Sequence, residues 1–279
     1  MAEKEIKINT IYNENCIDTM KRMPDNFIDL VVTSPPYDNL RIYETECEWN
    51  FDIFKQIANK LHSIIKDGGI MVWIVGDGVI GGTETGTSFK QALYFKDVGF
   101  NLHDTMIYQK NTFSFPSRNR YHQIFEYMFI LTKGTPKTFN PIKDRKNKYA
   151  GRTSGWGKNT IRQQNGSLKE ITNKLIINEY DMRPNIWRYV ISYGFIGDII
   201  ANEHPAIFSE KLAEDHIKSW SNEKDLVYDP FMGSGTVAKM CILSNRNYIG
   251  SEISNVYCKL AEKRIAKIKY YVPNHESWW

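Results

Sequence analysis

A glycine-rich loop between two predicted strands constrains this chain more than any other feature. Residues 226–228 form a short apolar run that predicts a strand, and the run leads into Asp-Pro-Phe-Met-Gly-Ser-Gly-Thr at 229–236. A helix is expected over 236–243 and a second strand over 248–251, with Glu252 directly after it. This order of strand, loop, helix and acidic strand end is typical of the nucleoside-binding half of a doubly wound sheet. The sequence therefore predicts an α/β fold.

The chemistry of this loop favours a nucleoside over a phosphate. Gly233 and Gly235 can adopt positive φ and carry no Cβ, so a ligand can approach the backbone closely. N–H groups at the start of the following helix suit a carboxylate or another anion. Glu252 has the spacing at which a carboxylate accepts both ribose hydroxyls, and no lysine follows the second glycine as it would in a P-loop. A turn with a purely structural role is the alternative.

A second loop, rich in proline, follows another predicted strand. The apolar run 28–32 ends at Thr33-Ser34-Pro35-Pro36-Tyr37, where two prolines stiffen the backbone. The Ser34 hydroxyl and the Pro35 carbonyl are hydrogen-bond acceptors, and Tyr37 offers an aromatic face. Together they can hold a planar ring that bears an amino group. A structural turn is again the alternative.

The rest of the sequence predicts further helices and strands on either side of these loops. Helices are expected over 51–65, 88–97 and 255–269, the first ending at the C-cap-like Lys-Asp-Gly-Gly of 66–69 and the second near Gly99. Strands are expected over 70–75, 101–109 and 124–132. Residues 134–183 have few apolar runs and no sustained period, which indicates a loop-rich insertion. The main domain then comprises 1–133 and 184–279.

Charge is distributed unevenly along the chain. The net charge is only +4, but residues 110–188 contain 16 Lys and Arg against 5 Asp and Glu, a balance of +11, and the remainder carries −7. Aromatic residues are interleaved with these cations, namely Tyr121, Phe125, Tyr149, Trp156 and Trp187. This combination is typical of a surface that binds a phosphate backbone. A solvated basic loop is the alternative.

Composition excludes several classes of protein. A mean hydropathy of −0.46 and the lack of an apolar stretch of membrane-spanning length exclude a membrane-embedded protein. The four cysteines contain no CxxC pair, which argues against a zinc site and a disulfide framework and fits a reducing cytoplasm. No metal is expected.

The two loops together resemble those of the amino-methylating DNA methyltransferases, which use S-adenosylmethionine. Residues 13–16 and 23–25 are similar to the N-terminal segment of that family, and 203–212 are similar to its segment before the glycine loop. The catalytic loop precedes the basic region and the cofactor loop follows it, as in the β group of these enzymes. The resemblance implies a single Rossmann-like fold with a mixed, mostly parallel seven-stranded sheet that includes an antiparallel hairpin. It also implies that the insertion 134–183 recognises a site on double-stranded DNA.

The resemblance assigns roles to three groups of residues. Catalysis would use Ser34, Pro35, Pro36 and Tyr37. The cofactor would be bound by Asn15, Thr33, Ser34, His204, Pro205, Asp229, Phe231, Gly233, Ser234, Gly235, Thr236 and Glu252. DNA would be bound by a basic cluster of Arg118, Arg120, Lys143, Arg145, Lys146, Lys148 and Arg152. Three of these have alternatives, since Phe231 can belong to the core, Asp229 can cap its own loop and His204 can be a packing residue.

The implied reaction is a direct methyl transfer to the exocyclic amino group of a flipped-out base. A covalent intermediate is not needed, in agreement with the lack of a Pro-Cys pair in the sequence. Serine at the first position of the proline loop resembles the cytosine-N4 enzymes, whereas adenine-N6 enzymes more often carry Asp or Asn there. Cytosine N4 is therefore expected, with adenine N6 as the alternative.

Other functions stay open at this point. The same fold can act on RNA or on a protein side-chain amide, and a DNA-binding relative with an inactive cofactor site is a further alternative. The sequence does not decide whether the chain forms a homodimer or has a cognate restriction endonuclease that acts on the same site. A cytoplasmic protein encoded by a prokaryote or a phage is expected.

Overall fold

The computed structural model describes residues 5–36, 49–112, 119–153, 160–170, 176–189 and 209–271. The chain divides into two compact units, one made of 1–140 with 185–279 and the other of 141–184. Residues 134–140, expected in the insertion, belong to the larger unit because the Lys137 N–H donates to the Gly68 carbonyl and the Asn140 N–H to that of Ser219. Within the described ranges, no helix is both long and apolar enough to cross a membrane.

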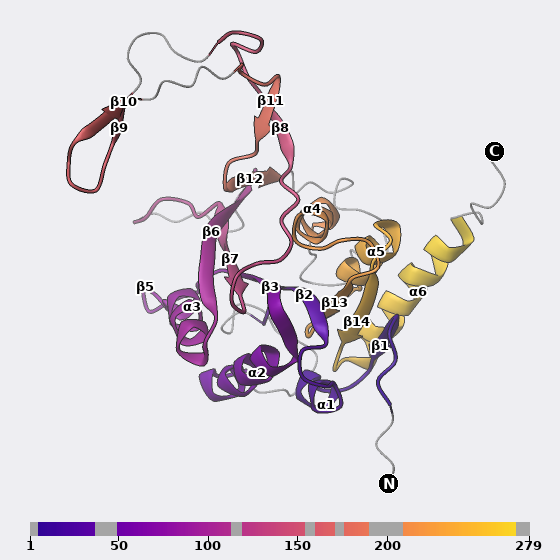
Figure 1. The fold of residues 1–279 in the computed structure, drawn as a ribbon. Helices are drawn as coiled ribbons and strands as arrows, with labels where there is room; N and C mark the ends of the chain where they lie inside the picture. The colour runs from indigo at the N-terminus through magenta and orange to yellow at the C-terminus, as the bar shows by residue number, and fades with distance from the viewer. Residues whose placement is uncertain are drawn as a thin grey trace, which may run out of the picture. The chain divides into compact units, whose positions relative to one another are not determined.

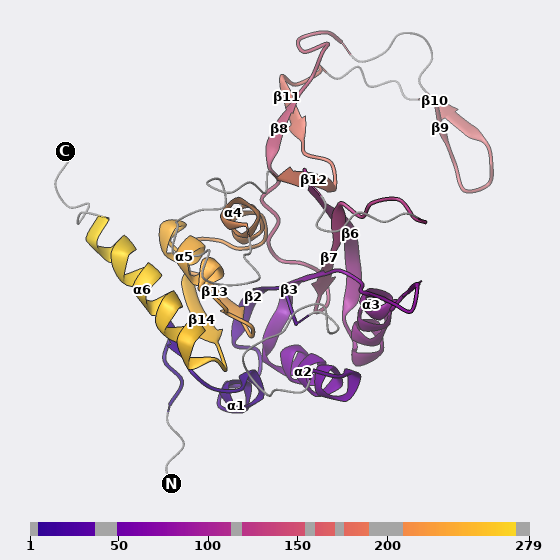
Figure 2. The same ribbon diagram turned by 180° about the vertical axis from the view of Figure 1, so that it is seen from behind.

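An eight-stranded sheet forms the centre of the larger unit (Figures 1 and 2). Its strands, in spatial order, are β1 (Thr10–Tyr12), β14 (Asn247–Ser251), β13 (Leu226–Asp229), β2 (Ile28–Thr33), β3 (Ile65–Val75), β7 (Phe125–Thr132), β6 (Asn101–Lys110) and β12 (Ile186–Tyr189). The first five run parallel, while β7 is antiparallel to both of its neighbours. The α/β class and the mixed, mostly parallel sheet are therefore confirmed. The sheet has one strand more than the resemblance implied, because β12 pairs in parallel with β6.

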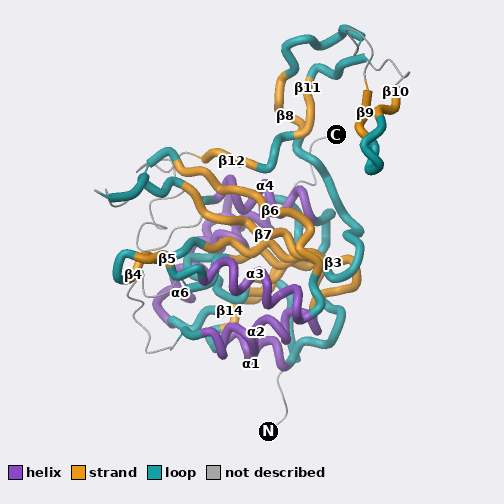
Figure 3. Tube along the Cα trace, turned by 90° about the vertical axis from the view of Figure 1, so that its left-hand side faces the viewer, coloured by secondary structure: helices purple, strands orange, loops and turns teal. Residues whose placement is uncertain are grey.

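Helices cover the sheet on both faces. Figure 3 shows α1 (Cys16–Lys21), α2 (Phe51–Ile64) and α3 (Thr87–Val98) on one side and α4 (Glu210–Trp220) on the other. The chain ends with α5 (Thr236–Leu243) and α6 (Asn255–Tyr271) around β14. Apolar residues of α2 recur at helical spacing and are buried, so the helix presents one stripe to the core. At the centre of that core the ring of Phe54 packs edge-to-face on Trp73 and Phe95.

The boundary between α2 and β3 differs from the expectation. The sequence predicts a helix C-cap at 66–69, but α2 ends at Ile64 and these residues lie in the first part of β3. Gly68 has a φ of +79°, and its N–H donates to the Lys133 carbonyl. The pairing of β2 with β3 also shifts register between Ile28 and Leu30. The two glycines therefore permit an irregular start of a strand rather than the end of a helix.

The smaller unit is built from hairpins. β8 (Lys143–Lys146) pairs with β11 (Tyr180–Met182), and β9 (Thr160–Arg162) pairs with β10 (Leu168–Glu170), both antiparallel. Cross-strand ion pairs join Arg145 to Asp181 and Arg183 to Asp144. Nearly all side chains of these four strands are exposed, so the described part of this unit is held together by backbone pairing and charge rather than by a core.

Candidate active site

Four neighbouring parallel strands end at one edge of the sheet and bring the predicted motifs together. β1 leads to Asn15, β14 to Glu252, β13 to the glycine loop and β2 to Ser34. The strands are in register, with Tyr12 opposite Ser251, Asp229 opposite Gly250, and Tyr228 opposite Val31. Because the carboxyl ends of parallel strands meet at the same edge, this is where such a sheet binds ligands.

A buried hydrogen bond links the two loops directly. The Thr33 hydroxyl donates to Oδ1 of Asp229 at 2.6 Å, although the two residues are 196 positions apart in the chain. The N–H of Phe231 donates to the same oxygen at 3.0 Å. Burial raises the pKa of the Asp229 carboxyl to about 7, although both hydrogen bonds oppose the shift. Asp229 thus caps its own loop, one of the two roles predicted for it, and also ties that loop to the end of β2.

Glu252 is positioned to bind a diol. Its carboxylate accepts hydrogen bonds from the N–H of Gly233 at 2.7 Å and from that of Ser254 at 2.8 Å, one on each oxygen. A carboxylate has about four acceptor positions, so both oxygens keep capacity for hydroxyl donors. Burial raises the pKa of Glu252, and the backbone N–H groups oppose this shift. These features fit the ribose of the predicted cofactor.

The glycine loop packs closely against its surroundings. Gly235 has a φ of +80°, and a Cβ at this position would lie 2.7 Å from Cβ of Ala261 on α6. The ring of Phe231 packs edge-to-face on Trp49 at 5.5 Å and on Trp73 at 6.2 Å between centroids. Phe231 therefore packs against the core cluster, one of its two predicted alternatives.

The proline loop leaves the sheet next to this loop. Pro35 is buried, while Ser34 and Pro36 are half-buried. Tyr37 lies outside the described residues, as do His204 and Pro205 of the predicted cofactor site. The other predicted residues of the proline loop and the glycine loop lie at the same edge of the sheet.

Asn15 has a structural contact in addition to its place at this edge. Its side-chain oxygen accepts from the N–H of Ile17 at 2.9 Å and caps the short helix α1. The neighbouring Asn13 reaches across the edge, because its amide donates to the carbonyl of Glu252 at 2.8 Å. The N-terminal segment therefore borders the site.

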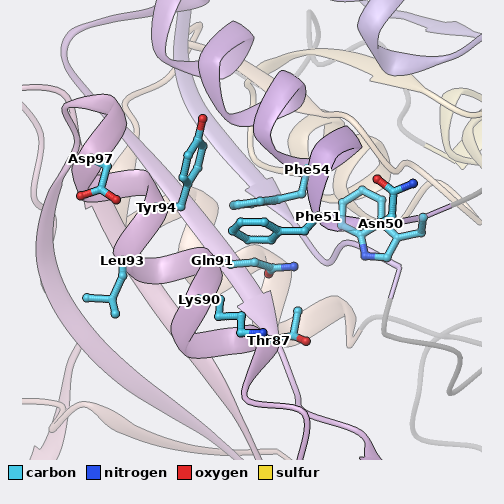
Figure 4. A pocket seen from close by; sticks show the side chains of 10 residues that line it. Asn50, Phe51, Phe54, Thr87, Lys90, Gln91, Leu93, Tyr94 and Asp97 are labelled. Atoms are coloured by element: carbon cyan, nitrogen blue, oxygen red, sulfur yellow. The ribbon is translucent and has the colours of Figure 1, made fainter.

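A pocket of about 500 Å³ lies between α2 and α3 (Figure 4). It is lined by Trp49, Asn50, Phe51, Phe54, Thr87, Lys90, Gln91, Leu93, Tyr94 and Asp97. None of these residues was a candidate from the sequence. Trp49 connects the pocket to the glycine loop, because its ring also contacts that of Phe231.

The predicted basic cluster is divided between the two units. Arg120 belongs to the larger unit, where its guanidinium donates to the Gly82 carbonyl at 2.6 Å in the turn between β4 (Val79–Ile80) and β5 (Thr83–Glu84). Arg145 pairs with Asp181, and Lys148 and Arg152 lie over the Tyr149 ring. Lys143 and Lys146 are exposed on β8, and Arg118 and Trp156 lie outside the described residues.

One of the aromatic residues that the sequence interleaves with the basic residues is part of the core. Trp187 lies on β12 with 5% of its surface exposed, and its ring stacks on the buried His216 at 4.6 Å. The interleaving of aromatic and basic residues in the sequence could not distinguish this tryptophan from an exposed residue such as Tyr121. The described residues also contain no group of three or more His, Cys, Asp or Glu side chains that could hold a metal ion.

One buried charged residue next to the glycine loop was not anticipated from the sequence. Arg264 on α6 is 1% exposed and donates to Ser234, Thr236 and Glu210. No sequence signal marks Arg264, since an arginine in an amphipathic helix is ordinarily solvated. Glu210 lies in the segment 203–212, which the sequence analysis likened to the family's segment before the glycine loop.

Comparison with known proteins identifies the family. Residues 28–263 match the family described as DNA methylase, whose members are N6 and N4 methyltransferases. The chain is 53% identical to the orphan methyltransferase M.BamHII of Bacillus amyloliquefaciens over 90% of its own length and 92% of that protein. Among solved structures, PvuII DNA methyltransferase (cytosine-N4-specific) shares the fold, with a TM-score of 0.68 at 19% identity over 98% of this chain and 89% of that one.

The chain belongs to this family of DNA methyltransferases. A further solved structure, a complex of M1.HpyAVI with SAM, has a TM-score of 0.59 at 23% identity and covers 92% of this chain and 98% of that one. Membership of the family confirms the predicted cofactor, S-adenosylmethionine. Because the family is described as DNA methylase, its match favours DNA over the RNA and protein acceptors that the sequence left open.

Proposed function

We propose that this protein is a site-specific DNA methyltransferase that modifies N4 of a cytosine flipped out of the duplex. The observation that carries the proposal is the buried hydrogen bond from Thr33 to Asp229, which holds the proline loop beside the cofactor loop. The amino group of a base bound at Ser34 then lies next to a methyl donor bound over the glycine loop. Positioning of this kind is the main need of the reaction, because the donor is already activated.

S-adenosylmethionine supplies a methyl group on a positively charged sulfur. The new C–N bond forms as the C–S bond breaks, and the electron pair of that bond stays on sulfur. Ser34 Oγ and the Pro35 carbonyl accept hydrogen bonds from the amino hydrogens and stabilise the positive charge that develops on nitrogen. The amine then loses a proton to water. Pro36 stiffens the loop, and Tyr37 stacks on the extruded base.

The preference for cytosine rests on Ser34. A hydroxyl is a neutral acceptor, and serine at this position resembles the cytosine-N4 enzymes. PvuII methyltransferase, which shares the fold, is described as cytosine-N4-specific. Adenine N6 is the alternative, with the same mechanism.

Binding of the duplex is assigned to the basic cluster. We propose that Lys143, Arg145, Lys146, Lys148 and Arg152 of the smaller unit, with Arg118 and Arg120, contact phosphates or base edges, and that this unit recognises the target sequence. No endonuclease partner is part of the proposal, since the relative M.BamHII is described as an orphan. A DNA substrate and a bacterial relative favour the cytoplasm of a prokaryotic cell as its location.

Modification-sensitive sequencing of DNA from a methylation-deficient bacterial host tests the proposal. Wild-type protein should place N4-methylcytosine at one short recurring sequence. The Ser34→Ala variant should lose most of the mark, because one of the two acceptors is removed. Ser63→Ala is the matched control, since Ser63 is also half-buried but lies on α2 among residues without a proposed role.

The outcomes separate the parts of the proposal. A methyl mark on adenine would overturn the proposal of cytosine as the target base but would leave the proposed mechanism unchanged. Full activity of Ser34→Ala would overturn the role of that hydroxyl. If the wild-type protein left no methyl mark on DNA at all, the proposed function would be wrong.

A further inference from the structure

A buried arginine on α6, Arg264, forms hydrogen bonds to the glycine loop. Arg264 is 1% exposed on α6, which runs along the outer part of the sheet beside α5 and β14 (Figures 1 and 2). Its Nη1 donates to the Ser234 carbonyl, to the Ser234 hydroxyl at 3.0 Å and to the Thr236 hydroxyl at 3.3 Å. Burying a guanidinium is unfavourable unless its donors find acceptors. The loop supplies three of them.

The charge of Arg264 is balanced by a carboxylate on another helix. Nη2 of Arg264 donates to Oε1 of Glu210 at 2.8 Å, and Nζ of Lys239 on α5 lies 2.7 Å from the same oxygen. Glu210 is the first residue of α4, directly after the Ser209 N-cap. The network therefore joins α4, α5 and α6 beneath one loop.

The peptide between Ser234 and Gly235 is held at both ends. Its carbonyl accepts from Arg264, while its N–H donates to the Met232 carbonyl at 2.9 Å. Gly233 and Gly235 both have positive φ, at +52° and +80°. A loop with two such glycines has alternative peptide orientations of similar energy. The two hydrogen bonds select one of them.

Arg264 also fixes the role of the two hydroxyls. A guanidinium has donors only, so Ser234 Oγ and Thr236 Oγ1 must both act as acceptors toward it. Each hydroxyl then has its own proton to donate to another group. The pair is preset to donate, which suits an anionic or oxygen-bearing ligand such as the carboxylate of the methionine part of the cofactor.

We propose that Arg264 is a positioning residue for cofactor binding: it fixes the Ser234–Gly235 peptide and presets the Ser234 and Thr236 hydroxyls as donors. Its role rests on the function proposed above. Because the loop is organised before the ligand arrives, binding does not have to order it. The Arg264 side chain acts through Ser234 and Thr236.

Isothermal titration calorimetry with S-adenosylmethionine and S-adenosylhomocysteine tests the proposal on the full-length chain. Arg264→Met should weaken binding of both on the order of tenfold or more, in line with the loss of hydrogen bonds to a charged group. The KM for the cofactor should rise similarly, while the KM for DNA and kcat at saturating cofactor stay near the wild-type values. Cofactor affinity of Arg264→Lys should lie between those of the wild type and Arg264→Met, because lysine keeps the charge and one donor nitrogen.

Arg246→Met is the matched control. Arg246 is also partly buried, and its guanidinium donates to the Ser221 hydroxyl and to the carbonyls of Ser221 and Ser244. Its loss should lower the melting temperature without changing cofactor affinity. If Arg264→Met does not fold, Glu210→Gln provides the second test. It removes the charge partner of Arg264 and should weaken cofactor binding to a smaller extent.

The results distinguish this inference from the proposed function. Wild-type protein that binds neither ligand would overturn both. If the wild-type protein binds the ligands and Arg264→Met or Arg264→Lys binds them as tightly, the inference alone would be overturned. The same holds if Arg246→Met weakens cofactor binding as much as Arg264→Met, because the effect would then follow from reduced stability.

Discussion

At the scale of single residues, the proton on Asp229 is the most distinctive property of the site. Its carboxyl is buried, and Oδ1 accepts from both Thr33 and Phe231. With a pKa of about 7, it is protonated in a substantial fraction of molecules near neutral pH. A positively charged ligand beside the loop favours the ionised form, so cofactor binding and release of this proton should be coupled.

The first prediction concerns Asp229→Asn. The folded-state pKa of about 7 lies above the ordinary value of 3.8, so the folded protein keeps a proton that the unfolded chain loses as the pH rises. Wild-type stability should therefore fall as the pH rises from about 4 to about 7 through this group. Asparagine cannot ionise, and its oxygen can still accept both hydrogen bonds. In thermal unfolding without cofactor, the melting temperature of Asp229→Asn relative to wild type should rise between pH 5 and pH 8.

The exposed Asp18 on α1 supplies the control. Its carboxylate pairs with Lys21 on the surface, and Asp18→Asn tests the removal of a carboxyl outside the site. An Asp229→Asn difference that is the same at both pH values would contradict the prediction.

The second prediction tests the link between the loops. Thr33→Val keeps the shape of the side chain but removes the donor to Asp229, leaving a buried carboxyl with one hydrogen bond fewer. We expect a loss of about 1–3 kcal/mol in the free energy of unfolding, together with a lower kcat. Urea denaturation and methylation assays measure the two effects. Thr33→Ser keeps the hydroxyl and should recover most of both, and equal losses in the two variants would show that the hydrogen bond is unimportant.

Sequence reasoning at this scale found residues whose type alone carries the chemistry. Asp229 and Glu252 stand at strand ends, which can be predicted from an apolar run, and Gly235 follows in the loop after Asp229. Arg264 and Trp49 could not be found in this way, because their importance comes from what α6 and Phe231 place beside them. Long-range contacts of this kind leave no local pattern.

At the scale of elements, α6 shapes the glycine loop by close packing. Ala261 and Arg264 are three residues apart and lie on one face of the helix. The first leaves no room for a side chain at Gly235, and the second binds the carbonyl of Ser234. The helix thus limits both the size and the orientation of the loop.

The third prediction separates crowding from backbone strain. Gly235→Ala and Gly82→Ala introduce a side chain at nearly the same φ, +80° and +81°. At Gly82 a Cβ meets nothing within 4 Å, whereas at Gly235 it lies 2.7 Å from Cβ of Ala261. Gly82→Ala should cost about 1–2 kcal/mol of stability from strain alone. Gly235→Ala should cost more and should also weaken cofactor binding.

Chemical denaturation and cofactor calorimetry on the two variants provide the measurement. Equal stability losses and unchanged cofactor affinity for Gly235→Ala would contradict the close packing of α6.

Long periodic segments were predictable from the sequence, and short or irregular ones were not. The buried stripe of α2 follows the helical period, and β2, β3 and β7 are continuous apolar runs. β1 and β12 have three and four residues, too few for a period to stand out. The helix C-cap predicted at 66–69 was wrong because a glycine at positive φ, here Gly68, occurs in irregular strands as well as at helix ends.

At the scale of the whole molecule, charge is divided unevenly between two parts of the chain. The −7 part of the chain holds the cofactor loops, and the +11 part contains the smaller unit. Counting charges along the sequence identifies this basic region. It could not tell which cations are already neutralised, as Arg145 is by Asp181, because that depends on strand pairing.

The fourth prediction concerns DNA binding by the smaller unit. Replacing Lys143, Lys146 and Lys148 together by Ser should weaken DNA binding and make its salt dependence shallower, by about 0.9 in the log–log slope for each phosphate that the variant no longer neutralises. Cofactor affinity should not change. Binding titrations at several salt concentrations measure the slope.

Replacing the exposed Lys259, Lys263 and Lys267 of α6 by Ser removes the same charge from the larger unit. If both triple variants lost DNA affinity and slope to the same extent, net charge rather than the smaller unit would be responsible.

The points where the chain leaves and re-enters the larger unit are both anchored there. Asn140 binds the backbone at the end of α4, through its N–H to Ser219 and its amide to Lys218 and Ser221. Asn185 donates to the Thr105 carbonyl and accepts from the Ile107 N–H. Genetic recombination with breakpoints at 140/141 and 184/185 would preserve these anchors. Given the recognition role proposed for the smaller unit, exchange of the segment between these anchors would give a gene a new recognition sequence while its methyl-transfer domain is inherited unchanged.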